Sequence, residues 1–119
     1  MPEAVREAFT QELSAAREAA NPESMWRALE RAHILSQPWP WPHTVAHWRM
    51  LSLALRQHDR HEAIGQVVRR AVAAPGSATG RYPRGNTGRA TVGLRETMLI
   101  PDALAQFLAS EAPGVKANR

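Results

Sequence analysis

Apolar residues recur at helical spacing along most of the chain, and this pattern predicts four helices in the first two thirds. The predicted helices cover residues 3–20, 22–36, 43–57 and 60–74. Residues three, four and seven apart lie on one face of a helix, so each segment offers an apolar face to a core. The residues predicted to face inward are Val5, Phe9, Leu13, Ala16 and Ala20; Met25, Trp26, Leu29, Ala32, His33 and Ile34; Val45, Trp48, Leu51 and Leu55; and Ile64, Val67, Val68, Ala71 and Val72.

Prolines, glycines and capping residues separate these helices. Asn21 and Pro22 fit the N-cap and the first residue of the second helix, and Asp59 can cap the fourth. Three prolines alternate with two tryptophans over residues 38–42. Each proline lacks an N–H and restrains the residue before it, so this corner is predicted to be extended and stiff. The pair Pro75-Gly76 is predicted to stop the fourth helix.

The last third of the chain changes character. Residues 75–100 hold five of the seven glycines and show no helical stripe, so an irregular segment lying over the helices is expected. A short helix is predicted over residues 102–110, followed by a disordered tail over 113–119. The predicted fold class is all-α, with two antiparallel helical hairpins packed as a bundle or a tetratricopeptide-like pair in one domain, residues 1–112.

Composition narrows the chemistry further. The chain of 119 residues has no cysteine, which excludes disulfides, thiolate metal sites and cysteine nucleophiles. The net charge of +4 comes mostly from arginines interleaved with glutamates on the predicted helices, a pattern typical of a mixed-sign surface. No apolar run approaches the roughly 20 residues of a membrane span, and the start lacks a secretory signal. A soluble cytoplasmic protein with no membrane partner is expected.

The candidate site is a histidine cluster. His43 and His47 are four residues apart, and Glu30 and His33 are three apart, so each pair shares a helix face. If the second and third helices fold back on each other about the proline corner, His33 falls opposite Ala46, between His43 and His47. Three imidazoles with an open fourth position can bind zinc, copper or iron. Glu30 would be a fourth ligand or an acceptor that orients an imidazole.

A structural interpretation of the same residues stays open. A histidine on an apolar face is often a hydrogen-bonded core residue, and Glu30 could pair with Arg31 or Arg49. A metal-bound water on three histidines could hydrolyse a substrate, but no second catalytic group is evident. Whether the protein is an enzyme is therefore left open.

Two other functions compete with metal binding. The first is a metal-free tetratricopeptide-like interaction module, in which Trp39 and Trp41 contact a protein partner or a second copy of the chain. The second is weak nucleic-acid binding by the arginines of the glycine-rich segment, although no recognised motif is present and this partner is not expected. Those arginines are Arg81, Arg84, Arg89 and Arg95.

The chain resembles a known family in several stretches. They are Leu29-Glu30-Arg31-Ala32-His33, then His43-Thr44-Val45-Ala46-His47-Trp48, and later Gly85-Asn86-Thr87-Gly88 and Ile100-Pro101. These stretches are similar to an uncharacterised bacterial domain-of-unknown-function family, number three thousand seven hundred and three. His33, His43 and His47 match its E-R-A-H and H-x-x-x-H-W signature. The resemblance implies no established activity, and it implies metal handling or metal resistance only through association with neighbouring genes.

Overall fold

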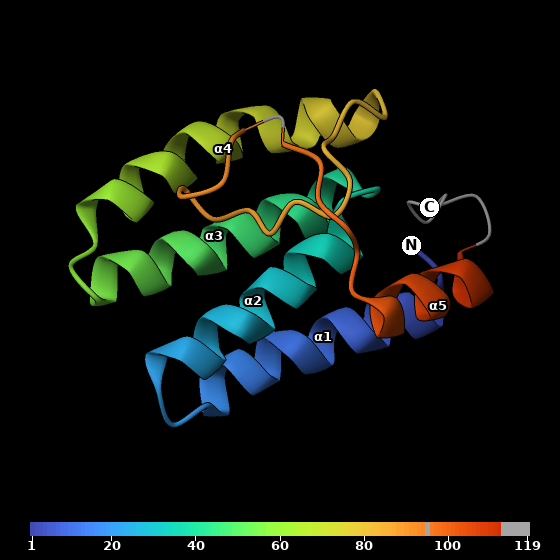
Figure 1. Cartoon of the computed structure of the whole chain (residues 1–119), viewed down its shortest axis with the longest axis horizontal. Coiled ribbons are helices and arrows are strands. Elements are labelled where there is room, and N and C mark those ends of the chain that lie inside the picture. The colour runs from blue at the N-terminus through green and yellow to red at the C-terminus, as the bar shows by residue number, and fades with distance from the viewer. Residues whose placement is uncertain (95, 113–119) are drawn as a thin grey trace.

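Five helices make up the described part of the chain, and Figure 1 shows their arrangement. The computed structural model describes residues 1–94 and 96–112, and of residues 70 and 72–74 it describes only the backbone. This part of the chain contains no strand, which confirms the all-α fold class. None of its helices is both long and apolar enough to cross a lipid bilayer. The helices are α1 (Glu3–Glu18), α2 (Pro22–Ser36), α3 (Pro40–Arg56), α4 (Arg60–Ala78) and α5 (Asp102–Glu111).

The helices form the two predicted antiparallel hairpins. Helix α1 packs on α2, α3 packs on α4, and the end of α2 lies against the start of α3 (Figure 1). Helix α5 lies across the beginning of α1 and completes an apolar cluster with Val5, Leu35 and Leu104. The irregular segment between α4 and α5 returns over α3 and α4, as expected for a covering segment (Figure 1). This return is what brings distant polar residues to the ends of α2 and α3.

The proline corner is shorter than its sequence suggested. Asn21 and Asp59 cap α2 and α4 as expected, each side chain accepting a backbone N–H at 2.9 Å. Helix α3, however, begins at Pro40, directly after its extended N-cap Trp39. The prediction of an extended corner through residue 42 is therefore wrong. A proline in the first turn of a helix removes no helical hydrogen bond, because the N–H groups of that turn have no partner within the helix.

The end of α4 also differs from the prediction. The helix continues through Pro75 and Gly76 to Ala78. Ser77 lies in this extra turn, where its hydroxyl donates to the Gln37 carbonyl at 2.5 Å. The same hydroxyl oxygen lies 2.6 Å from Nδ1 of His43. These tertiary hydrogen bonds hold the turn in place and offset the backbone bond that proline removes.

Helix α4 turns its polar side inward, opposite to the predicted orientation. Ile64, Val67 and Val68 are 68%, 57% and 51% exposed. Glu62 and Gln66 are instead buried. Ala71 is also exposed, and the side chain of Val72 lies outside the described residues. The stripe on α3 is likewise only partly buried, because Leu51 lies in the core while Trp48 and Leu55 do not. Glu62, Gln66 and Ser77 join the hydrogen-bond network around the histidines. Arg69 donates to the Val92 carbonyl. Each buried polar side chain thus has a partner, which explains why this face is inside.

Candidate metal centre

Three histidines meet at one buried point between α2, α3 and the irregular segment. His33 comes from the last turn of α2, and His43 and His47 come from the first half of α3. Nε2 of His33 lies 2.9 Å from Nε2 of His43 and 3.1 Å from Nε2 of His47. The three side chains are 3–5% exposed, and their ligand atoms all lie within 4.8 Å of one another. The predicted convergence of the three imidazoles is confirmed.

The other ring nitrogen of each histidine meets an oxygen. Nδ1 of His33 lies 2.8 Å from the backbone carbonyl of Asn86. Nδ1 of His43 lies 2.6 Å from Oγ of Ser77, and Nδ1 of His47 lies 2.7 Å from Oε1 of Gln66. Each ring is therefore held through its Nδ1 by a different part of the chain, and the three Nε2 atoms face one another.

These contacts determine where the imidazole protons lie. The Asn86 carbonyl can only accept, so Nδ1 of His33 donates to it. Gln66 presents its carbonyl oxygen to His47, because its amide nitrogen donates to Glu62 Oε1 and to the Gly88 carbonyl, both at 2.7 Å. Ser77 has already given its proton to the Gln37 carbonyl, so its oxygen accepts from His43. A neutral imidazole has one N–H, and each Nε2 therefore carries a lone pair.

A proton does not easily occupy the space between these nitrogens. Burial lowers the pKa of His33 well below its ordinary 6.5, and the neighbouring His47 and His43 lower it further. Lone pairs about 3 Å apart repel, and a cation at their meeting point turns that repulsion into coordination. Tetrahedral zinc with bonds of about 2.0–2.1 Å sets its nitrogens about 3.3 Å apart, close to the separations seen here.

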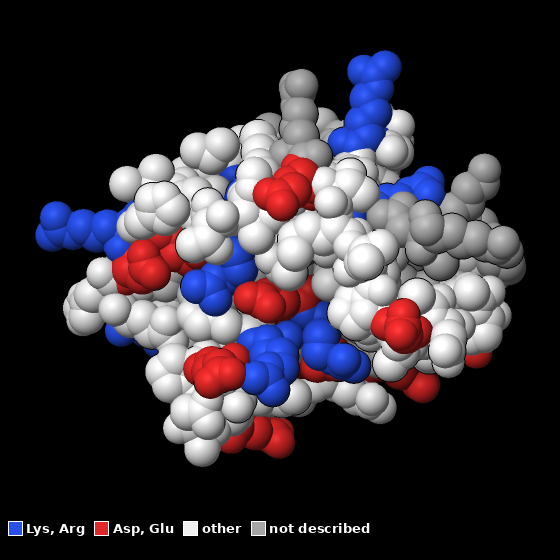
Figure 2. Space-filling view, in the orientation of Figure 1, with Lys and Arg blue, Asp and Glu red and all other residues white. Residues whose placement is uncertain are grey.

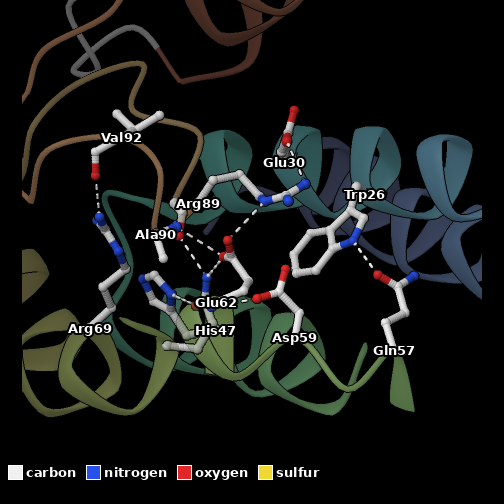
Figure 3. Close-up of polar contacts among 12 residues, drawn as sticks. Trp26, Glu30, His47, Gln57, Asp59, Glu62, Arg69, Arg89, Ala90 and Val92 are labelled. Atoms are coloured by element: carbon white, nitrogen blue, oxygen red, sulfur yellow. Dashed lines mark hydrogen bonds and ion pairs between the residues drawn. The ribbon is translucent and has the colours of Figure 1, made fainter. Parts of the chain in front are cut away.

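Glu62, Arg89 and Ala90 form a hydrogen-bonded group beside His47 (Figure 3). This group fixes the orientation of Gln66, whose Oε1 lies next to Nδ1 of His47. Glu62, which is 1% exposed, accepts the Gln66 amide through Oε1. The same oxygen accepts the backbone N–H of Ala90 at 2.9 Å, and Oε2 accepts Nε of Arg89 at 3.2 Å. The buried carboxylate is thus compensated by three donors, as a buried charge requires. It holds the Gln66 oxygen toward the imidazole.

The turn over residues 85–88 closes the site over His33. Gly88 has a φ of +82°, and a Cβ there would lie 2.8–2.9 Å from three atoms of the His33 ring. The Asn86 side chain holds the turn, accepting the Gly88 N–H and donating to the carbonyls of Gly93 and Glu96. The glycine lets the backbone lie flat against the imidazole.

Glu30 is not brought into the cluster. Its carboxylate lies 3.6 Å from Nη1 of Arg89 and is half-buried. Burial raises the pKa of Glu30, and the charge of Arg89 partly opposes that rise. Arg89 also lies over the ring of Trp26, 3.7 Å from its centroid, and so occupies the space beside Glu30 (Figure 3).

The fold separates the residues of the two other predicted binding surfaces, which are the tryptophan pair and the arginines of the irregular segment. Trp41 is 76% exposed, whereas Trp39 packs on the apolar cluster of Val5 and Leu35. The two tryptophans therefore do not form one exposed patch.

The described arginines of the irregular segment do not gather on one surface either. Arg89 points inward to Glu62, and Arg95 lies outside the described residues. Positive and negative side chains lie intermixed on the face drawn in Figure 2. That mixture does not resemble a basic track for a phosphate backbone.

The sequence interpretation missed the residues that orient the histidines. Gln66, Ser77 and Asn86 are far from the histidines along the chain, and nothing in the apolar pattern marks them. One sequence pattern did indicate a second face on this helix. Glu62, Gln66 and Arg69 recur at helical spacing, opposite the apolar face. The turn Gly85-Asn86-Thr87-Gly88 entered the sequence interpretation only as part of the family resemblance.

The fold and the site define a small all-α protein with three buried histidines whose Nε2 atoms converge. The chain belongs to the family described as "Protein of unknown function (DUF3703)", which matches residues 3–108 and confirms the resemblance. No curated protein matches the chain, and no solved structure does. The family description assigns no activity, so function has to be argued from the site itself.

The lowered pKa of His33 predicts how stability depends on pH in the metal-free protein. Below about pH 6.5 the unfolded chain binds a proton that folded His33 refuses, so the free energy of unfolding should fall as pH falls. Above that pH the histidine is neutral in both states and contributes no slope. The slope from one such group is at most about 1.4 kcal/mol per pH unit. Urea unfolding at several pH values measures it.

A His33→Gln variant is the comparison for this measurement. It lacks the titrating group and should lose less stability than the native protein between about pH 7.5 and about pH 5.5. His61→Gln removes an exposed imidazole from α4 and serves as the matched control. If His33→Gln loses as much free energy of unfolding on acidification as the native protein, or more, the lowered pKa of His33 is not the cause of the pH dependence.

Proposed function

We propose that this protein binds a transition-metal ion through the Nε2 atoms of His33, His43 and His47. The observation that carries the proposal is the hydrogen bonding of the three Nδ1 atoms. Each Nδ1 donates to a fixed oxygen, so three neutral nitrogens present lone pairs to one point. Histidines that ligate metals are oriented in this way by partners on their other nitrogen.

The donor set suits zinc, copper or iron. Imidazole nitrogen is a good ligand for all three, and three protein ligands leave a coordination position for a further group. Glu30 has no place in this ligand set, because Arg89 binds its carboxylate. The proposed role is metal handling. No reaction is assigned, because the described residues that line the cavity beside the imidazoles include no carboxylate that could act as a base.

A protein-interaction surface is a second candidate, supported by a separate observation. Trp41, Trp48 and Leu55 are seven residues apart on α3 and are 76%, 51% and 59% exposed. Such spacing places them along one side of the helix. This surface is independent of the metal proposal, and a second copy of the chain or another protein would suit it equally.

Metal titration of tag-free protein tests the proposal. The native protein should bind one equivalent of Zn²⁺. His33→Ala and His47→Ala should each lose affinity by more than the roughly 10–100-fold expected for the loss of an outer partner. His61→Ala, which removes an exposed histidine, should bind as the native protein does. Circular dichroism checks that the variants remain helical, and equal binding by all four proteins would show that the site is not real.

Glu62→Gln tests the orienting chain behind His47. The substitution keeps the shape of the side chain but removes the charge that accepts from Arg89, Ala90 and Gln66. Zn²⁺ affinity should fall about 10–100-fold, because Gln66 is no longer fixed with its oxygen toward the imidazole. Glu23→Gln, in an exposed ion pair on α2, is the control and should bind normally. Unchanged affinity in Glu62→Gln would remove this residue from the account.

A further inference from the structure

The three imidazoles line one wall of a cavity of about 360 Å³. This volume lies at the small end of the range for ligand pockets in proteins. Helix α4 and the start of the irregular segment provide the other walls. Arg69, Arg81 and Tyr82 are among the residues on those walls, and none of the described residues that line the cavity is an aspartate or a glutamate.

Arg69 supplies a nearly buried positive charge to the cavity. Its side chain comes from the inward face of α4, and the residue is 7% exposed. Nη2 donates to the carbonyl of Val92, and the guanidinium forms no ion pair with a described carboxylate (Figure 3). Glu62, an acid that attracts it, is already bound by Arg89. A guanidinium has five N–H donors, so Arg69 has donors beyond the one given to Val92.

Arg81 supplies a second positive charge, at the rim. It follows Gly80, whose φ of +68° turns the chain after α4. The residue is exposed but also lines the cavity. Within the described part of the chain its guanidinium has neither a hydrogen-bond acceptor nor an ion-pair partner. The guanidinium group suits carboxylates and oxyanions, and two arginines line the walls of this one small cavity.

We infer that this cavity binds a small anion, a carboxylate or a tetrahedral oxyanion, as the further ligand of the metal held by the three histidines, with Arg69 and Arg81 as its second contacts. This inference rests on the proposed metal function. A divalent ion on three neutral imidazoles, beside two guanidiniums and no carboxylate, gives the cavity a strong positive charge. An anion neutralises that charge, whereas a cationic ligand would add to it.

Cobalt-loaded protein makes both binding events visible. Co²⁺ replaces zinc in histidine sites, and its visible absorption changes with its ligands. The native protein loaded with Co²⁺ is titrated with acetate in one arm and inorganic phosphate in the other, so that the two classes of anion are distinguished. The absorption should shift with at least one of them. Arg69→Met and Arg81→Met should bind Co²⁺ normally but weaken the anion by about tenfold or more.

Arg60→Met is the matched control, because Arg60 is an exposed arginine on α4 that does not line the cavity. Arg81→Met protects the test against misfolding, since Arg81 is exposed and its side chain holds no other residue. If Co²⁺ binds and neither anion changes the spectrum, the anion inference fails while the metal proposal stands. If both arginine variants bind the anion as the native protein does, the inference also fails. Absence of a Co²⁺ spectrum would overturn the metal proposal and the inference together.

Discussion

The positions of three imidazole protons are the constraint on which the site depends. In each ring the proton lies on Nδ1, held by the Asn86 carbonyl, the Ser77 hydroxyl or the Gln66 amide oxygen. The opposite nitrogens then face one another across about 3 Å with lone pairs. Facing lone pairs repel one another and suit a cation, so this cluster could hold a metal ion, and an ion bound there would stabilise the fold.

Several departures from ordinary helix packing serve this arrangement. Helix α4 passes Pro75 to place Ser77 against His43. It also turns Gln66 inward, which leaves Ile64 in solvent. The irregular segment returns across the helices so that Asn86 reaches His33 and a glycine lies against its ring. Each departure supplies a contact to one histidine, so the three histidines join segments that lie far apart in the sequence.

Local sequence patterns predicted the helices and the meeting of the histidines well. Helical spacing placed His43 and His47 on one face, and the fold-back about the prolines set His33 at their height. The orienting partners were beyond such reasoning, because Ser77 and Asn86 reach the site through tertiary folding. The position of Glu30 was also mispredicted because a tertiary contact decides it. Its spacing from His33 was right for one helix face, but Arg89 arrives from the irregular segment and binds it.

The orientation of α4 shows why apolar periodicity alone can mislead. Its apolar stripe was assigned to the core, yet its polar residues have buried partners that water cannot replace. Burying Glu62 and Gln66 is favourable only because every donor and acceptor around them is matched. A buried polar network can therefore outweigh several exposed valines and isoleucines, and nothing in a single sequence reveals the network in advance.

Long-range ¹H–¹⁵N NMR of the imidazole rings tests the central claim most directly. With one equivalent of Zn²⁺, His33, His43 and His47 should each show a protonated Nδ1 and a proton-free Nε2 whose nitrogen shift moves on metal addition. His61, on the exposed side of α4, should not respond. A proton on Nε2 in any of the three rings of the zinc-loaded protein, or Nε2 shifts that ignore the metal, would contradict the account.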